Sequence, residues 1–193
     1  MLEVDEGLFR AINGLSGNSD LLDRLLSLAA GDYLIPVFIG LILVYVWLIS
    51  SESPDAKRGK NNVILCLITM STASAIVFIW NLFYFRERPF TLNEVNLLFY
   101  MPTDSSFPSN TAAGLAGLSM PILFESKRLF ALASIGCILM CFARIYVGIH
   151  YPSDILVGFL IAFASLVLCI KLVELSEPFI RRIIKLADKS KLT

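Results

Sequence analysis

The chain has 193 residues, of which 56% are hydrophobic and only 17% are charged. Its mean hydropathy of +0.74 exceeds that of an ordinary soluble domain, so we expect apolar surface to be buried in a membrane as well as in the protein. The formal net charge is zero, which excludes a charge-based argument for a nucleic-acid partner. The four cysteines lie inside apolar runs without the spacing of metal ligands, which indicates small core residues and no metal site.

Residues 1–32 are expected to form amphipathic helices that lie at the membrane interface. In residues 2–13, apolar and mainly acidic side chains alternate at roughly helical spacing. In residues 20–30, leucines alternate with aspartates and an arginine. Both segments are too charged and too short to cross a bilayer, which is typical of interfacial helices. An alternative is that the second segment enters the bundle as part of a first span.

Five apolar runs follow and alternate with polar connections. They cover residues 33–50, 61–85, 109–124, 129–143 and 155–170. Crossing a hydrocarbon core of about 30 Å takes roughly 20 apolar residues in a helix. The sequence therefore predicts an all-α fold, an integral membrane helical bundle of five to six transmembrane helices. We expect one domain over residues 1–193, with its transmembrane core at 33–170.

Basic residues are unevenly distributed over the connections. Eleven of the 16 Lys and Arg residues lie in the 51–60 loop, the 125–128 turn and the 171–193 tail, which five spans would place on one side. The positive-inside rule assigns that side to the cytoplasm. We therefore expect a plasma (inner) membrane protein with a cytoplasmic C-terminus, whose basic tail forms an interfacial helix. The other connections then face the periplasm or the exterior.

Three polar clusters fall on the predicted outer side. They are Arg86-Glu87-Arg88-Pro89, Phe107-Pro108-Ser109-Asn110-Thr111, and the stretch from Arg144 to Asp154. Arginine suits a phosphate ligand because its planar guanidinium donates two hydrogen bonds at once and keeps its charge. Pro108 followed by Ser109 predicts a helix start, where free backbone amides bind a phosphoryl group. The alternative interpretation is that these charges only face water in membrane loops.

The third cluster contains the only histidine of the chain, His150. Asp154 follows four residues later at a predicted helix start, from which its carboxylate can accept the ring N–H of His150. That contact would fix the tautomer and leave the other ring nitrogen as a nucleophile. The alternative is that Asp154 only complements the helix dipole.

At these residues the sequence resembles the membrane-bound type 2 phosphatidic acid phosphatase superfamily, which includes bacterial lipid phosphatases and vanadium haloperoxidases. The family pattern is Lys-x6-Arg-Pro, Pro-Ser-Gly-His and Ser-Arg-x5-His-x3-Asp. This chain matches it at Arg88-Pro89, Pro108-Ser109 and the set Arg144, His150 and Asp154. The resemblance implies a phosphohistidine mechanism without metal or cofactor. In it His150 attacks phosphorus, Asp154 orients His150, and the phosphoryl oxygens are held by Arg88, Ser109 and Arg144. We place Asn110 in the same phosphate-binding set.

Two departures from the family pattern matter for the chemistry. Asn81 stands where the first motif has Lys, and Thr111 stands where the second motif has His. Arg86 is the expected substitute for the lost cation. The lost histidine is the family's general acid, a role worth about 10²- to 10⁴-fold that threonine cannot fill near neutral pH. Asp104, Glu94 or a water molecule could supply the proton instead.

The leaving group therefore decides the expected substrate. An alkoxide needs a proton, whereas a phosphate leaving from a diphosphate is already a stable anion. We expect an integral membrane lipid phosphatase acting on an isoprenoid (undecaprenyl-type) diphosphate, with that lipid and the bilayer as its partners. The alternatives are a phosphatidylglycerol phosphate, phosphatidate or lipid A phosphatase, a phosphotransferase, a non-catalytic relative that binds or moves a phosphorylated lipid, and a purely structural bundle. The sequence predicts no oligomeric state.

Overall fold

The protein is described by a computed structural model that covers residues 2–51, 56–92 and 94–190. Over these residues every regular element is a helix, which confirms the predicted all-α fold. The elements are α1 (Leu2–Asn13), α2 (Asp20–Ala30), α3 (Leu34–Ser51), α4 (Ala56–Asn81), α5 (Pro89–Leu92), α6 (Asn110–Ser119), the 3-10 helix η1 (Met120–Phe124), α7 (Lys127–Tyr146) and α8 (Pro152–Ser190).

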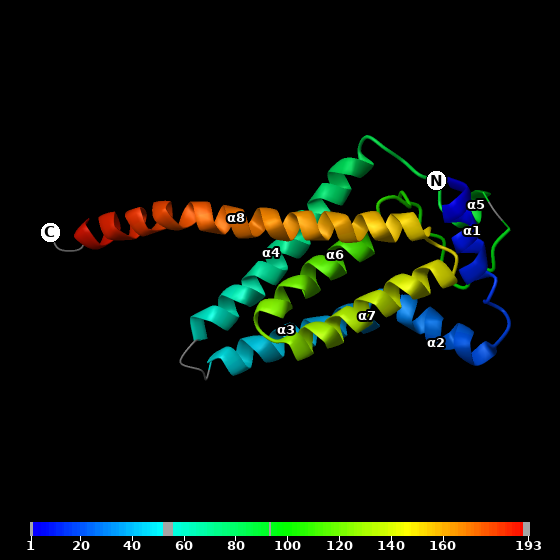
Figure 1. The fold of residues 1–193 in the computed structure, drawn as a ribbon, viewed down its shortest axis with the longest axis horizontal. Coiled ribbons are helices and arrows are strands. Elements are labelled where there is room, and N and C mark those ends of the chain that lie inside the picture. Colours follow the sequence, from blue (N-terminus) through cyan, green and yellow to red (C-terminus); the bar gives the residue numbers. More distant parts are fainter. Residues whose placement is uncertain (1, 52–55, 93, 191–193) are drawn as a thin grey trace.

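The long helices form an elongated bundle, with α1, α2 and α5 gathered at one end (Figure 1). The centre of the bundle is α6, which packs against both α4 and α8. Small residues allow this close approach. A Cβ added at Gly117 would lie 3.1 Å from the Met70 Cα of α4, and one added at Gly158 would lie 2.8 Å from the Ser109 carbonyl oxygen. Helix α8 is thereby held against the first turn of α6.

Large apolar side chains cover the outside of the bundle. Ile135 on α7 is 64% exposed, and Leu156 and Phe163 on α8 are 61% and 59% exposed. Such a surface is unstable in water and suits lipid, where helices satisfy their own backbone groups. The helix surfaces therefore support a multi-pass membrane protein.

By length and composition alone, fewer helices qualify as full-length spans than the five to six transmembrane helices predicted. Three helical segments are long and apolar enough to cross a membrane, namely Arg58–Asn81, Lys127–Tyr146 and Pro152–Glu174. Helices α2 and α3 pass the same test together as a pair bent by 52°. The predicted run 109–124 forms the apolar helix Asn110–Phe124 over nearly its full length, and this helix is shorter than the three segments above. By length and composition the described residues thus contain three spans, or four with the bent pair, and that pair matches the alternative in which the second N-terminal segment joins a first span.

Several predicted boundaries are wrong, among them the start of α4 at Ala56, inside the predicted 51–60 loop. Helix α4 ends at Asn81 instead of continuing to residue 85, because the chain turns toward the loop in which the Arg86 N–H donates to Ser105 Oγ and the Ser106 N–H donates to the Arg86 carbonyl. The tail is not a separate interfacial helix, since α8 continues without a break through 39 residues to Ser190. At 1.5 Å per residue this helix is about 58 Å long, and its C-terminal part projects beyond the other helices (Figure 1).

Candidate active site

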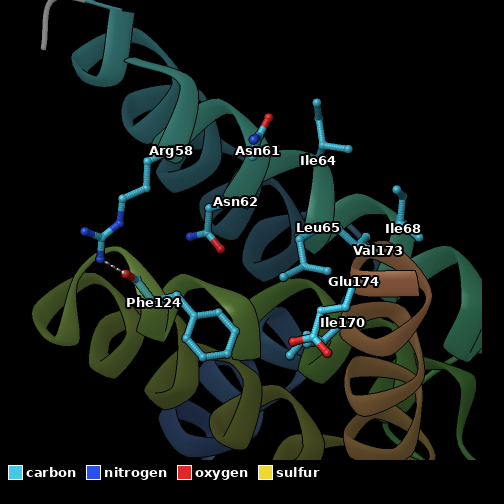
Figure 2. Close-up of a pocket in the computed structure, with 10 residues that line it drawn as sticks. All are labelled: Arg58, Asn61, Asn62, Ile64, Leu65, Ile68, Phe124, Ile170, Val173 and Glu174. Carbon is cyan, nitrogen blue, oxygen red and sulfur yellow. Dashed lines mark hydrogen bonds between the residues drawn. The ribbon is translucent and has the colours of Figure 1, made fainter. Parts of the chain in front are cut away.

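All three polar clusters meet at one end of the bundle, around a cavity of about 170 Å³. Six of the eight positions singled out from the sequence line it: Asn81, Arg88, Asn110, Thr111, Arg144 and His150. Ser109 and Asp154 are fully buried directly beside His150. A larger cavity of about 460 Å³ lies between α4, η1 and α8 at the opposite end, with mostly apolar walls (Figure 2). None of the eight positions lines that second cavity, so the smaller one is the candidate site.

The loop between α7 and α8 presents His150 to the cavity. Gly148 has a φ of +89°, a left-handed conformation that turns the chain after α7 and that other residues rarely adopt. His150 itself is only 2% exposed. Its Nδ1 lies 3.1 Å from the Ser106 carbonyl oxygen. Because a carbonyl only accepts hydrogen bonds, Nδ1 carries the proton and Nε2 keeps its lone pair.

The surroundings of His150 favour the neutral ring. Burial lowers the pKa of His150 below its ordinary value of 6.5, the nearby Arg88 lowers it further, and Asp154 opposes the shift. The unprotonated Nε2 lies 3.4 Å from Ser109 Oγ and 3.5 Å from Arg88 Nη1. A nucleophile is therefore available at neutral pH beside two groups suited to phosphoryl oxygens.

Asp154 is fully buried at the start of α8, and its carboxylate is held from three directions. Oδ2 accepts hydrogen bonds from the Tyr151 backbone N–H at 2.8 Å and from Ser106 Oγ at 2.5 Å, and Oδ1 accepts one from Arg86 at 2.7 Å. Oδ2 lies 3.5 Å from His150 Nδ1, beyond an ordinary hydrogen bond. The expected direct His–Asp hydrogen bond is thus a looser contact, and the Ser106 carbonyl is the nearer acceptor.

Arg86 does not substitute for the missing lysine. Its guanidinium donates to Asp154 Oδ1 at 2.7 Å, Asp5 Oδ2 at 2.8 Å and Ser153 Oγ at 2.7 Å, and it lies 4.1 Å from the centre of the Tyr151 ring. Burial opposes this charge, but Asp5 and Asp154 outweigh it and raise the pKa of Arg86. The side chain is thus engaged behind the cavity and fixes Asp154.

The two arginines that line the cavity are each paired with a carboxylate. Arg88 donates from Nη1 to the Ile149 carbonyl at 2.8 Å and from Nη2 to Asp104 Oδ1 at 2.9 Å. Arg144 donates to Asp32 Oδ1. Asp32 and Asp104 also line the cavity, as does Tyr100, whose hydroxyl donates to Asp32 Oδ2 at 2.9 Å.

The start of α6 matches its prediction. Ser109 is the N-cap of α6, and its Oγ accepts the Ala112 N–H at 3.3 Å. The Ser109 backbone N–H donates to the Asp154 carbonyl oxygen at 3.0 Å, which ties α6 to α8. Asn110 and Thr111 follow in the first turn and face the cavity. At the end of α4, the Asn81 Oδ1 atom is buried without a hydrogen-bond partner among the described residues.

Several site residues were missed by the sequence reasoning. Asp5, Asp32 and Ser106 lie outside the quoted motifs, and Asp5 and Asp32 carry no local sign of their contacts. Ser106 adjoins the second motif, so the pair Ser105-Ser106 was the one available signal. Of the two carboxylates proposed as proton donors, Asp104 lines the cavity, whereas Glu94 is exposed and lies outside its lining.

Comparison with known proteins identifies this arrangement. A family model described as the PAP2 superfamily matches residues 62–177. The chain belongs to the PAP2 superfamily. It is 30% identical over 181 residues to the protein named undecaprenyl-diphosphatase BcrC from Bacillus subtilis (strain 168), covering 94% of this chain and 90% of that protein. A protein named undecaprenyl-diphosphatase from Sulfolobus acidocaldarius is 30% identical over 120 residues, covering 61% of this chain and 58% of that protein.

Solved structures share the fold of this PAP2 chain. The crystal structure of Aquifex aeolicus LpxE superimposes with a TM-score of 0.69 at 26% identity, covering 87% of this chain and 95% of that one. The PAP2-type phosphatidylglycerolphosphate phosphatase from Bacillus subtilis superimposes with a TM-score of 0.63 at 18% identity, covering 90% and 86%, which shows the common fold. The chain is a membrane phosphatase of the PAP2 superfamily, as its motifs predicted.

Proposed function

We propose that the chain hydrolyses the terminal phosphate of an isoprenoid diphosphate of the undecaprenyl type. The observation that carries the proposal is a buried His150 facing Arg88 in a cavity where Thr111 replaces the second histidine. Such a site supplies a nucleophile and cations but lacks a histidine to protonate a departing alkoxide. A diphosphate needs no such proton. The naming of the Bacillus subtilis relative as an undecaprenyl-diphosphatase supports the same substrate class.

In the first step, the lone pair of His150 Nε2 attacks the terminal phosphorus. The P–N bond forms while the bond to the bridging oxygen breaks, and the isoprenoid monophosphate leaves as an anion. Arg88, Arg144 and Ser109 would hold the phosphoryl oxygens, together with free amides at the start of α6. The Nδ1 proton stays on the ring and faces the Ser106 carbonyl and Asp154, which stabilise the positive charge that the ring acquires.

In the second step, water attacks the phosphohistidine. The P–N bond breaks, Nε2 recovers its electron pair, and the proton of the attacking water goes to the released inorganic phosphate. These steps draw on side chains and water alone. Asp154 acts here as a positioning residue, because it orients and stabilises the ring without reaching the phosphorus.

We propose further that the enzyme lies in the plasma (inner) membrane with this site on the outer side and the C-terminus in the cytoplasm. The support is the distribution of basic residues, since 11 of the 16 Lys and Arg residues lie in segments assigned to the opposite side.

The test of substrate class is phosphate release by the detergent-purified full chain. Undecaprenyl diphosphate is compared with undecaprenyl phosphate and phosphatidylglycerol phosphate, and His150→Ala serves as the inactive control. We expect turnover of the diphosphate at least about 100-fold above the monoesters, the low end of what a missing general acid costs. Comparable monoester hydrolysis would contradict the leaving-group argument and assign the proton to Asp104 or another cavity group. Lipid binding without any turnover would favour the non-catalytic alternative.

A further inference from the structure

Two carboxylates are paired with the cavity arginines that we propose hold the substrate phosphate. Asp32 binds Arg144, and Asp104 binds Arg88. Because all four side chains line the cavity of about 170 Å³, an incoming phosphate meets arginines that are already paired. We propose that Asp32 is an internal competitor of phosphate, which holds Arg144 in the empty site, yields it to the substrate, and reclaims it when inorganic phosphate leaves. This proposal deepens the proposed function and rests on it for the identity of the lipid.

Burial decides which partner of the pair moves. The Arg144 side chain is 5% exposed and lies over the Phe99 ring, with 5.6 Å between its central carbon and the ring centre. Asp32 is 43% exposed at the bend between α2 and α3. A displaced Asp32 carboxylate can be hydrated, whereas a displaced Arg144 would remain buried without a partner, which is far more costly. The exchange therefore leaves Arg144 in place and transfers it from Asp32 to the phosphate.

Asp32 also keeps a second anchor during the exchange. Its Oδ2 atom accepts the Tyr100 hydroxyl at 2.9 Å, while Oδ1 faces Arg144. Loss of the Arg144 contact leaves the Tyr100 hydrogen bond intact, so the carboxylate stays close enough to return. Arg144 Nε is buried without a hydrogen-bond partner among the described residues, which leaves donor capacity for a phosphoryl oxygen.

The same arrangement occurs at Arg88. The Arg88 side chain is 5% exposed and its partner Asp104 is 67% exposed. Backbone carbonyls of Asp104 and Ile149 also accept hydrogen bonds from Arg88, which fixes the guanidinium when the Asp104 carboxylate departs. The charges of Arg88 and Arg144 are thus balanced by those of Asp104 and Asp32, and a diphosphate can replace both carboxylates at once.

Asp32→Asn tests the proposal, with inorganic phosphate as the probe. The asparagine keeps the size of the side chain and an oxygen for Tyr100 but removes the charge that competes for Arg144. The affinity of the detergent-purified full chain for inorganic phosphate is measured by phosphorus NMR titration. We expect about three- to tenfold tighter binding, as for the loss of one partly exposed competing ion pair. Asp32→Glu, which keeps the charge, and Glu94→Gln, which removes an exposed charge outside the cavity, should both stay within twofold of wild type.

Thermal unfolding and steady-state kinetics provide independent readouts. Without phosphate, Asp32→Asn should unfold at a lower temperature than wild type, and added phosphate should raise its unfolding temperature more than it raises that of wild type. With lipid substrate, KM and kcat should both fall, because phosphate binds more tightly and leaves more slowly. Unchanged or weaker phosphate binding by folded Asp32→Asn would overturn the proposal, since Asp32 would then only orient Arg144.

Asp104→Asn provides the second variant if Asp32→Asn does not fold. Arg88 keeps its two backbone carbonyl partners in that variant, and the same rise in phosphate affinity is expected. An unchanged phosphate affinity there would reject the competitor mechanism for the cavity. Phosphate titration needs no lipid. If the proposed lipid is wrong, the phosphate affinities are unaffected, and the error is detected only in the substrate comparison.

Discussion

His150 is held as a neutral nucleophile by its neighbours. The Ser106 carbonyl at 3.1 Å requires the proton on Nδ1, and burial lowers the pKa of the ring below 6.5. The depressed pKa keeps Nε2 unprotonated at neutral pH, so catalysis by this nucleophile should decline only on the acid side of pH 6.5. The free energy of unfolding should also decrease as the pH falls below 6.5, because His150 binds a proton more readily in the unfolded chain than in the folded one.

Nitrogen NMR can test this state directly because the chain has one histidine. Protein labelled with 15N-histidine should show the Nδ1–H tautomer at pH 7 and a titration midpoint below 6.5. Asp154 raises the pKa of the ring, so Asp154→Asn should shift the midpoint further down. An Nε2–H tautomer, or a midpoint above 6.5, would show that Nε2 is not poised for attack.

The first helix is part of the active site through a chain of charged contacts. Asp5 of α1 accepts from Arg86, and Arg86 donates to Asp154, which lies beside His150. Asp5 also accepts from the Ser153 backbone N–H at 2.8 Å, which ties α1 to the start of α8. At the other end of α1, the Asn13 side chain donates to the Tyr146 carbonyl at 2.8 Å. Helix α1 is therefore fixed at both ends against the elements that carry His150.

Asp5→Asn should consequently slow the chemical step without weakening substrate binding. We expect kcat to fall about tenfold, a typical loss for a group that supports a site residue from behind, with KM within twofold of wild type. The matched control is Glu3→Gln, which removes an exposed acid from the same helix and should leave both constants unchanged. A purely structural role would lower the unfolding temperature and leave the 15N-histidine midpoint where it is in wild type, whereas a positioning role shifts that midpoint.

Short sequence motifs explain which of the site residues could be predicted from the sequence. Motif spacing and cap chemistry singled out Arg88, Ser109, Arg144 and His150, because the sequence pattern that marks each of them lies within a few residues of it. Asp5 and Asp32 could not be found this way, since their partners Ser153 and Arg144 lie 148 and 112 residues away along the chain. Arg86 was assigned to phosphate for the same reason: its partner Asp5, which draws it behind the cavity, is 81 residues distant.

Hydropathy located the run 109–124 correctly but misplaced the end of the last helix. The run contains no charge and forms the helix Asn110–Phe124, whose N-cap at Ser109 is fixed by the site and whose other end is closed by the turn at Glu125–Ser126. Composition separates the basic tail from the last span, but α8 continues through the tail to Ser190.

The cavity and its polar residues lie at one end of the molecule, and the basic connections lie at the other. The loop that carries Arg88 and the loop that carries His150 meet at the cavity end of the bundle, whereas the 125–126 turn lies at the opposite end (Figure 1). If the positive-inside rule holds, a diphosphate must reach the cavity from the outer leaflet. The orientation therefore decides on which face of the membrane phosphate is released.

Cysteine labelling can measure this orientation because the four natural cysteines are all buried. Glu94 is exposed near the site end and Lys127 is exposed at the other end, so each position can carry a new reactive thiol. A membrane-impermeant maleimide added to intact spheroplasts should label Glu94→Cys and should label Lys127→Cys only after permeabilisation. The reverse pattern would invert the protein and place phosphate release in the cytoplasm. Labelling of both positions before permeabilisation would mean that the turn after η1 does not lie across the membrane from the site, and the short helix Asn110–Phe124 would then be a re-entrant element rather than a span.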